Sequence, residues 1–513
     1  MARRNYPLIF MPGIQRDGTN FAGRSWIDGQ WGRFKRGMPA KMLGYQNLNV
    51  EFPAIPRGTI IIPNNAFYGQ YIGFSNTLQY YTFNNQQNIT TPLTDRTPNN
   101  FVPNNNTLWS FDKFFYKDIQ ANVVIAHPGQ NLANINSALD SPVYFGFLNS
   151  QDAFQPTGQQ VSGGIVALSP YLFIFGNNGQ LSWSADSDPT DFASIDKGAG
   201  STIVTGQKIV AGMRIKGSQY YPGPSGLFWS LDSLIRATFT GNQNTWFRFD
   251  TISDEISILS SKSIIEDDSL YYWVGVDRFL YYDGQNWGEL PNKTNLDFFF
   301  NSLNYEQRQK VWATKVPRFG EIWWFFPKDG ALECNHAVIY NKRDKCWYDT
   351  PINRCCGQFE QTFAKPLWLD NQVNADNTYS AWVHETGVDQ NYNGNLTALE
   401  AFHESGNIAW CALAPDAQWK GIDSQVLLTR IEPDLIQSQD LTLDIKGREF
   451  ARSVVSENAG NNGDPYVIAE DTQFITTQEQ QRELTLRFGS NVLGGYYEMG
   501  NTLLEIDTGD VRA

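Results

Sequence analysis

The sequence predicts an all-β fold: a β-propeller of about six to seven irregular blades, with an N-terminal segment and a C-terminal β-sandwich. Aromatic residues make up 14% of the 513 residues and charged residues only 18%, which suits strands with apolar faces. Gly and Pro, with 43 and 24 residues, supply many turns. Short pairs of apolar strands also recur along the middle of the chain, whereas helical periodicity is scarce.

Seven strand pairs are predicted before residue 400. They cover residues 67–83, 122–148, 165–185, 227–241, 270–287, 321–349 and 366–387. Comparable apolar positions in five of the second strands lie 53, 46, 59 and 43 residues apart, at Leu181, Leu234, Leu280, Ile339 and Trp382. Small sheets that repeat every ~40–50 residues are typical of a propeller. Because the period is irregular, an array of β-sandwiches is the alternative.

One hairpin illustrates the repeat. In "VGVDRFLYYDGQNWGEL", Val274 to Leu290, two strands fold about Asp283-Gly284, a pair that tolerates positive φ. Trp287 is expected to face outward at the rim of the blade. Residues 295–312 have partly helical spacing after an N-cap-like Asn295, so one short helix is predicted there.

Three domains follow from shifts in pattern. Residues 1–55 form a basic N-terminal docking segment that ends at the Pro-rich stretch "IPRGTIIIPNN". Residues 56–399 form the propeller, and residues 400–513 form the β-sandwich. In the last of these, Leu441, Leu443 and Ile445 alternate with polar residues, which predicts a half-buried strand.

Charge is unevenly distributed along the chain. The formal net charge is −14, but residues 1–45 carry +6 and the remainder −20, with −11 from Glu400 onward. An acidic chain is a poor general binder of nucleic acid. The basic segment carries Trp26, Trp31 and Phe34 among its charges, which predicts that it folds against an acidic neighbouring protein or touches DNA; a solvated tail is the alternative. The candidate partner-docking residues are Arg16, Arg24, Arg33, Lys35, Arg36 and Lys41.

Catalytic and metal-binding motifs are not found in the sequence. The four His residues, 127, 336, 384 and 403, are isolated from one another. The cluster Asp186, Asp188 and Asp191 resembles both a carboxylate pair of a propeller glycosidase and an Asp-box turn, but an Asp/Ser turn between blades is favoured. The loop "DNQVNADNTYS" (370–380) lacks calcium-ligand spacing. We therefore predict no enzyme, no catalytic, cofactor-binding or metal site, and no cofactor.

Cysteine usage and hydropathy bear on the compartment. Five Cys residues without metal spacing predict buried, reduced thiols and assembly in a cytoplasm. The N-terminal apolar run is short and interrupted by Pro, so no signal peptide is expected. No run of 18 apolar residues occurs, and hence no membrane span is predicted.

The two ends of the chain resemble a known family. "PGIQRDGTNFAGRSWIDGQWGRFKRGMPAKMLGY" near the start and "ELTLRFGSNVLGGYYEMGNTLLEIDTGDVR" near the end are similar to the tail nozzle proteins, also called tail hub or DNA-stabilisation proteins, of short-tailed bacteriophages. The resemblance implies a structural virion protein, assembled in the host cytoplasm, that forms a homohexameric ring below the portal and adaptor. It also implies docking of tail fibres and transient passage of duplex DNA during ejection.

Charge is consistent with such a conduit, because Lys and Arg in its wall would bind phosphates and slow the DNA, whereas an acidic or amide-rich wall repels it. Two alternatives from other classes stay open. One is a propeller glycosidase or depolymerase, which needs two carboxylates about 5–10 Å apart in a central pocket. The other is a host-receptor binding module that works as a monomer.

Overall fold

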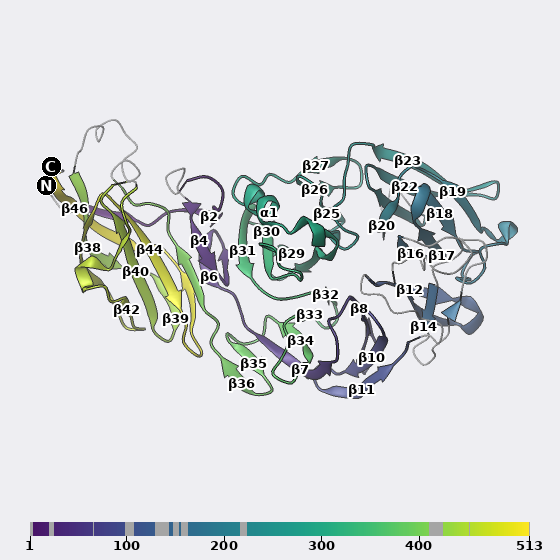
Figure 1. Cartoon of the computed structure of the whole chain (residues 1–513), viewed down its shortest axis with the longest axis horizontal. Coiled ribbons are helices and arrows are strands. Elements are labelled where there is room, and N and C mark those ends of the chain that lie inside the picture. The colour runs from purple at the N-terminus through teal and green to yellow at the C-terminus, as the bar shows by residue number, and fades with distance from the viewer. Residues whose placement is uncertain are drawn as a thin grey trace.

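The computed structural model describes residues 4–19, 25–64, 66–97, 107–128, 143–146, 153–154, 163–215, 223–409, 424–450 and 452–511. Nearly all of its regular structure is β-strand. Figure 1 shows two parts side by side, a ring of small sheets and an elongated stack of sheets, with both chain ends at the far end of the stack. None of the described helices is both long enough and apolar enough to cross a membrane.

The ring is a β-propeller. Within the described residues, six consecutive four-stranded antiparallel sheets are each built from strands adjacent in sequence. The first three blades contain β8 (Gly58–Pro63), β9 (Tyr68–Gly73), β10 (Leu78–Phe83), β11 (Ile89–Asp95), β12 (Ser110–Tyr116), β13 (Ala121–His127), β14 (Val143–Gly146), β15 (Ala153–Phe154), β16 (Gly164–Leu168), β17 (Tyr171–Phe175), β18 (Gln180–Trp183) and β19 (Gly200–Ile203). The next three contain β20 (Ile209–Arg214), β21 (Ser225–Ser230), β22 (Leu234–Asn242), β23 (Thr245–Ser253), β24 (Ile265–Asp267), β25 (Leu270–Val274), β26 (Phe279–Tyr282), β27 (Trp287–Glu289), β28 (Trp312–Val316), β29 (Glu321–Phe326), β30 (His336–Asn341) and β31 (Cys346–Pro351).

The seventh blade joins distant parts of the chain. Its strands are β32 (Cys356–Phe359), β33 (Pro366–Leu369), β34 (Tyr379–His384) and β7 (Tyr45–Phe52), with β35 (Gln390–Tyr392) and β36 (Asn395–Thr397) beyond β7. β7 lies before the first blade in sequence and pairs antiparallel with β34, from Tyr379 opposite Phe52 to His384 opposite Tyr45. The ring is thus closed by a strand from the N-terminal side. Each of the seven predicted strand pairs lies in a different blade, which confirms that prediction.

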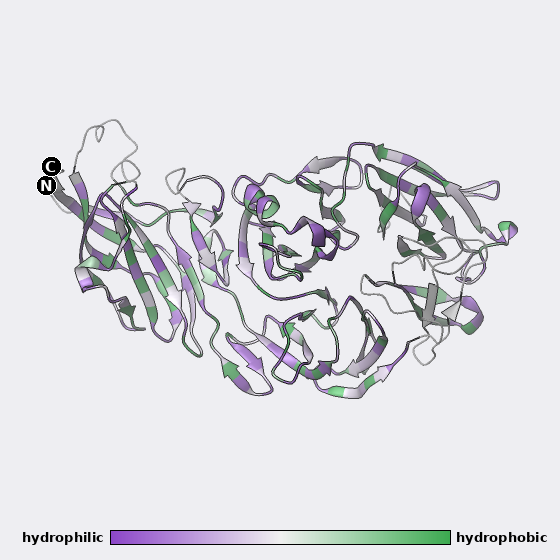
Figure 2. Ribbon diagram, in the orientation of Figure 1, coloured by the Kyte–Doolittle hydropathy of each residue, from purple (hydrophilic) through white to green (hydrophobic). Residues whose placement is uncertain are grey.

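Burial explains why these short strands form a ring. The second strands β9, β17, β21 and β29 are buried at every position, because both faces of each blade pack on neighbouring blades. Figure 2 shows hydrophobic residues along the strands of both parts of the molecule. The first strands contact one another between most successive blades, for example β8 with β12 and β32 with β8. They therefore line the axis of the ring.

The second part combines both ends of the chain in three sheets. Their strands are β1 (Arg4–Pro7), β4 (Asp28–Gln30), β5 (Gly32–Lys35), β6 (Met38–Lys41), β37 (Ala401–Glu404), β38 (Ser424–Glu432), β39 (Leu435–Ser438), β40 (Leu441–Arg448), β41 (Ser456–Glu457), β42 (Tyr466–Ile468), β43 (Ile475–Gln481), β44 (Glu483–Ser490), β45 (Tyr496–Met499) and β46 (Leu503–Val511). β1 pairs with β46, β4 with β37, and β6 with β45. We call this part the C-terminal domain.

The sequence predicted residues 1–55 as a separate docking segment. In the structure their described strands are instead distributed over the sheets of the C-terminal domain, the seventh blade, and the small parallel pair β2 (Met11–Ile14) and β3 (Ser25–Trp26). The predicted alternation in β40 is confirmed, since Leu441, Leu443 and Ile445 are buried. A short helix, α1 (Leu296–Ser302), lies in the range predicted to be helical.

Candidate functional site

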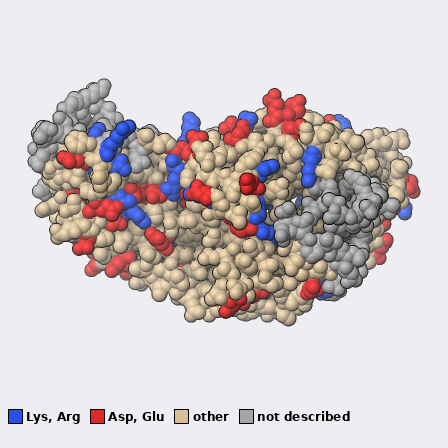
Figure 3. Space-filling model, in the orientation of Figure 1, with Lys and Arg blue, Asp and Glu red and all other residues tan. Residues whose placement is uncertain are grey.

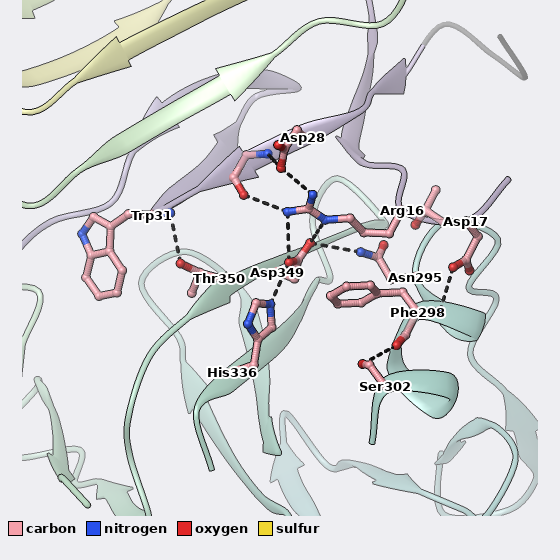
Figure 4. A network of polar contacts seen from close by, with 12 residues as sticks. Arg16, Asp17, Asp28, Trp31, Asn295, Phe298, Ser302, His336, Asp349 and Thr350 are labelled. Atoms are coloured by element: carbon pink, nitrogen blue, oxygen red, sulfur yellow. Dashed lines mark hydrogen bonds and ion pairs between the residues drawn. The ribbon is translucent and has the colours of Figure 1, made fainter. Parts of the chain in front are cut away.

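The described docking residues Arg16, Arg33, Lys35, Arg36 and Lys41 lie on the part of the N-terminal segment that packs on blade 6, blade 7 and the C-terminal domain. We call this region the seam. Figure 4 shows Arg16 at its centre, between Asp28 of its own segment and Asp349 of β31. Arg16 Nε donates to Asp349 Oδ1 at 2.8 Å, Nη2 donates to the Gly29 carbonyl at 2.9 Å, and Nη1 bonds to Asp28. His336 completes the network, with Nε2 at 2.8 Å from Asp349 Oδ2.

This network fixes the charge on Asp349. Burial alone would raise the pKa of the Asp349 carboxyl, but Arg16 and His336 outweigh burial and lower the pKa below its usual value. The same carboxylates outweigh the burial of Arg16 and raise the pKa of its guanidinium. Both groups are therefore ionised, and the Arg16–Asp349 pair joins the N-terminal segment to the propeller.

Asp17 attaches the same segment to α1. Its two carboxylate oxygens accept hydrogen bonds from the backbone nitrogens of Asp297 at 3.0 Å and Phe298 at 2.7 Å, in the first turn of the helix. The sequence predicted Asn295 as the cap, but the Asn295 amide points to Asp349 instead, at 3.4 Å. Asn295 does occupy the N-cap position, as predicted, but the side chain that bonds to the first-turn amides is Asp17, from a distant part of the chain.

Arg33 forms a second charged cluster, in which its own side chain and that of Glu321 are fully buried. Its Nε lies 3.0 Å from Glu321 Oε1, and Nη2 donates to Glu385 Oε1 at 2.6 Å. The guanidinium also lies 3.6 Å from the centre of the Phe319 ring. Burial raises the pKa of Glu321, Arg33 lowers it, Glu385 raises it, and the net shift is upward. One cation thus holds two buried carboxylates from blades 6 and 7.

The other predicted docking residues differ in exposure. Lys35 Nζ donates to Glu498 Oε2 at 3.1 Å, and Arg36, whose side chain is 82% exposed, pairs with the same carboxylate. Lys41 is buried, and burial lowers its pKa to about 8 despite the nearby Asp389. Arg24 lies outside the described residues.

These positions correct part of the docking prediction. Arg33 and Lys41 have no surface left for another protein, because this chain itself buries them. Arg16 and Lys35 are also paired with carboxylates of the same chain. The basic segment is folded against an acidic surface, as predicted from its aromatic residues, but that surface belongs to its own propeller and C-terminal domain. Arg36 alone among the described candidates is largely exposed.

The axis of the propeller is bridged by side chains at one end. Lys262, which precedes blade 5, donates from Nζ to the carbonyl oxygen of Trp109, which precedes blade 2 on the opposite side of the ring. Arg57, before blade 1, makes a two-pronged contact with Glu333, at 2.8 Å for each prong. Lys310 donates to the same carboxylate at 2.8 Å. These bonds cross the mouth of the ring where the first strands begin.

The acidic cluster of the sequence lies on a loop between β18 and β19. Asp188 Oδ1 accepts from the Thr190 backbone nitrogen at 3.0 Å, and Asp191 Oδ1 accepts from Ser194, also at 3.0 Å. This is the Asp/Ser turn that the sequence favoured, with carboxylates bonded to local amides. Asp370 begins the loop that lacks calcium-ligand spacing, and its carboxylate accepts hydrogen bonds from the Ser380 amide and the Trp382 indole, at 3.0 and 2.7 Å.

The histidines His127, His384 and His403 lie in buried surroundings. Burial lowers the pKa of His127 and of His403 to about 3. The His384 ring packs against Trp368 in a tilted arrangement, with ring centres 4.0 Å apart. Burial, and secondly the nearby Arg354, lower the pKa of His384 well below its usual value. In the described ranges, no group of three His, Cys, Asp or Glu side chains is placed to hold a metal ion.

Two arginines of the seam were missed by the sequence reasoning. Arg318 and Arg343 are exposed on the turns that follow β28 and β30, beside Lys35 and Arg36. The available signal was the basic turns "VPRFGE" and "NKRDKC", which follow strands of blade 6. They were not among the candidate docking residues because only the charge of the N-terminal segment was considered.

Comparison with known proteins adds little. No protein-family model and no curated protein matches the chain. Among solved structures, the chain is similar to BamB from Moraxella catarrhalis, with a TM-score of 0.36 and 10% identity, over 70% of this chain and 98% of that chain. A likeness at this level carries no argument about function, and the propeller assignment follows from the strand pairing above.

Proposed function

We propose that this chain is a structural protein of a bacteriophage tail, which forms a homohexameric nozzle, or hub, below the portal and adaptor. In this role it serves as a conduit for DNA ejection and as a platform for tail fibres. The observation that carries the proposal is the joint fold of the two segments that resemble the nozzle family. β1 pairs with β46 and β6 pairs with β45, so the N-terminal and C-terminal motifs build one domain.

Bonds that cross one end of the propeller axis bear on where a conduit would lie in the proposed assembly. The bonds from Lys262 to Trp109 and from Arg57 to Glu333 cross the ring, so a DNA duplex cannot pass along its axis. A channel for DNA therefore has to lie between copies of the chain. This geometry favours an assembly over a monomer with a central pore.

Surface charge also supports the proposal. Figure 3 shows few charged side chains on the lower front of the propeller, whereas charged side chains are spread over the C-terminal domain and the upper edge of the propeller. A surface with few Lys and Arg side chains binds phosphates weakly, so DNA can slide past it. We expect such uncharged or acidic surfaces to line the channel.

Electron microscopy tests the proposal, on the purified chain at rising concentration and on particles that contain it. The expected result is a six-fold ring with an axial channel, attached at one end to a ring-shaped adaptor. Particles with one or three copies of the chain would contradict the proposal. A chain that stays monomeric and binds cells or glycans would favour a host-receptor binding module instead.

A further inference from the structure

A basic groove opens on the surface of the seam. It has a volume of about 350 Å³ and lies between the end of β5, the turns after β28 and β30, and β45. Phe34 and Phe319 contribute apolar surface to it. Its charged lining residues are Lys35, Arg36, Arg318, Arg343, Asp344 and Glu498. Four cations against two carboxylates make the groove positive, in a chain whose net charge is −14.

Two of these cations are not neutralised. Glu498 is shared by Lys35 and Arg36. Arg318 and Arg343 are exposed and form no ion pair with any carboxylate of the described residues; Arg343 Nη2 donates to the Pro317 carbonyl at 3.1 Å, and Arg318 lies 5.3 Å from the centre of the Phe319 ring. Exposed guanidinium groups beside a groove suit carboxylates, which they bind through paired hydrogen bonds.

The loop between β18 and β19 has the complementary character. Asp186 and Asp196 are exposed there, while Asp188 and Asp191 hold the turn. Ile195 of the same loop is 71% exposed. Figure 1 places β18 and β19 at the end of the propeller that is remote from the C-terminal domain. The loop thus presents carboxylates and an apolar side chain at one end of the molecule.

We propose that the groove of one copy binds the β18–β19 loop of a second copy. The inference rests on the proposed function, which requires several copies around an axis. A positive groove repels itself across a two-fold axis, so a contact between copies through it joins two different surfaces, and head-to-tail contacts of this kind can close into rings. Carboxylates of the loop face Arg318 and Arg343, and Ile195 packs near Phe34 and Phe319.

Charge reversal on each side tests the proposal. The groove variant is Arg318→Glu with Arg343→Glu, and the loop variant is Asp186→Arg with Asp196→Arg. We expect each alone to raise the concentration for half-maximal assembly at least 10-fold, measured by light scattering after size exclusion and by native mass spectrometry. The control variant, Arg248→Glu with Arg452→Glu, reverses two arginines outside the groove and should assemble like the parent.

Mixing the two variants separates loss of contact from misfolding. In an equimolar mixture, the acidic groove of one variant faces the basic loop of the other, and the basic groove faces the acidic loop, so alternating rings should form. Parent-like assembly of either variant alone, or a mixture that stays dissociated, would overturn this contact and leave the ring itself standing. A parent chain that stays monomeric would overturn the ring and the contact together.

Discussion

Arg33 offers the sharpest test of how the N-terminal segment holds the molecule together. Its guanidinium has no solvent exposure and contacts Glu321, whose side chain is also fully buried, and Glu385, which is 9% exposed. Replacing Arg33 with Met keeps an unbranched aliphatic side chain but removes the charge and the guanidinium that lies over the Phe319 ring. Two carboxylates from neighbouring blades are then left buried without a cation.

The expected cost follows from that geometry. Breaking a buried ion pair by removing one partner costs about 3–5 kcal/mol of unfolding free energy. In a domain of this size such a loss lowers the midpoint of thermal unfolding by about 5–10 °C. Arg36→Met is the matched control, because Arg36 lies three residues further on and pairs with Glu498 at the surface. Loss of a surface pair costs about 0–1 kcal/mol.

The midpoint of thermal unfolding of both variants is measured by circular dichroism, and the measurement is repeated at several pH values. Burial already raises the pKa of Glu321, and without Arg33 this pKa rises further. A carboxyl whose folded-state pKa is raised lowers the free energy of unfolding at high pH, and this loss disappears when the carboxyl is protonated. The destabilisation caused by Arg33→Met should therefore be smaller at pH 5 than at pH 8. Adding Glu321→Gln and Glu385→Gln should restore most of the loss. A defect no larger than that of Arg36→Met, or one independent of pH, would refute this account of the cluster.

Three further predictions concern single groups. Lys41→Met should raise the melting temperature at pH 7 and have the melting temperature of the parent near pH 10. The pKa of Lys41 is about 8 in the folded state and 10.5 in the unfolded state. The buried charge therefore destabilises the parent below pH 8, and the parent becomes more stable as the pH rises from 8 toward 10.5. Glu333→Gln should cost about 2 kcal/mol in denaturant unfolding at pH 7 and less below pH 4.5, since burial raises and Arg57 lowers the Glu333 pKa, with a net decrease. Asp188→Asn with Asp191→Asn should cost about 1 kcal/mol, because Asn still accepts from the turn amides; a large loss of particle infectivity with the fold intact would instead favour the glycosidase alternative.

The blades could be predicted because their signal is local. Alternation and turn residues such as Asp283-Gly284 depend on neighbours in sequence, and Gly284 indeed has a φ of +97°. Closure of the ring could not be predicted in the same way. β7 pairs with β34 more than 300 residues later in the chain, and nothing in either strand specifies the other. The place of β1 beside β46 was hidden for the same reason.

The candidate site was predictable in charge but not in geometry. Composition showed that residues 1–45 are basic and the remainder acidic, which indicates attraction without saying which carboxylates are involved. Arg33 pairs with Glu321 and Glu385, and Arg16 pairs with Asp349. These pairings depend on the whole fold. A net charge reports the sum over a segment, so it cannot separate cations that are used internally from those left for a partner.

That distinction bears on how a ring of such chains would hold together. The N-terminal segment supplies β7 to the propeller and β1, β4, β5 and β6 to the C-terminal domain, so the two parts share one stretch of chain and are clamped at the seam by buried ion pairs. In the proposed role, force applied to the C-terminal domain would therefore load the Arg33 and Arg16 clusters. The exposed cations beside this clamp, Arg318 and Arg343, are consequently held on a rigid support, which lowers the entropy cost of binding a neighbour there.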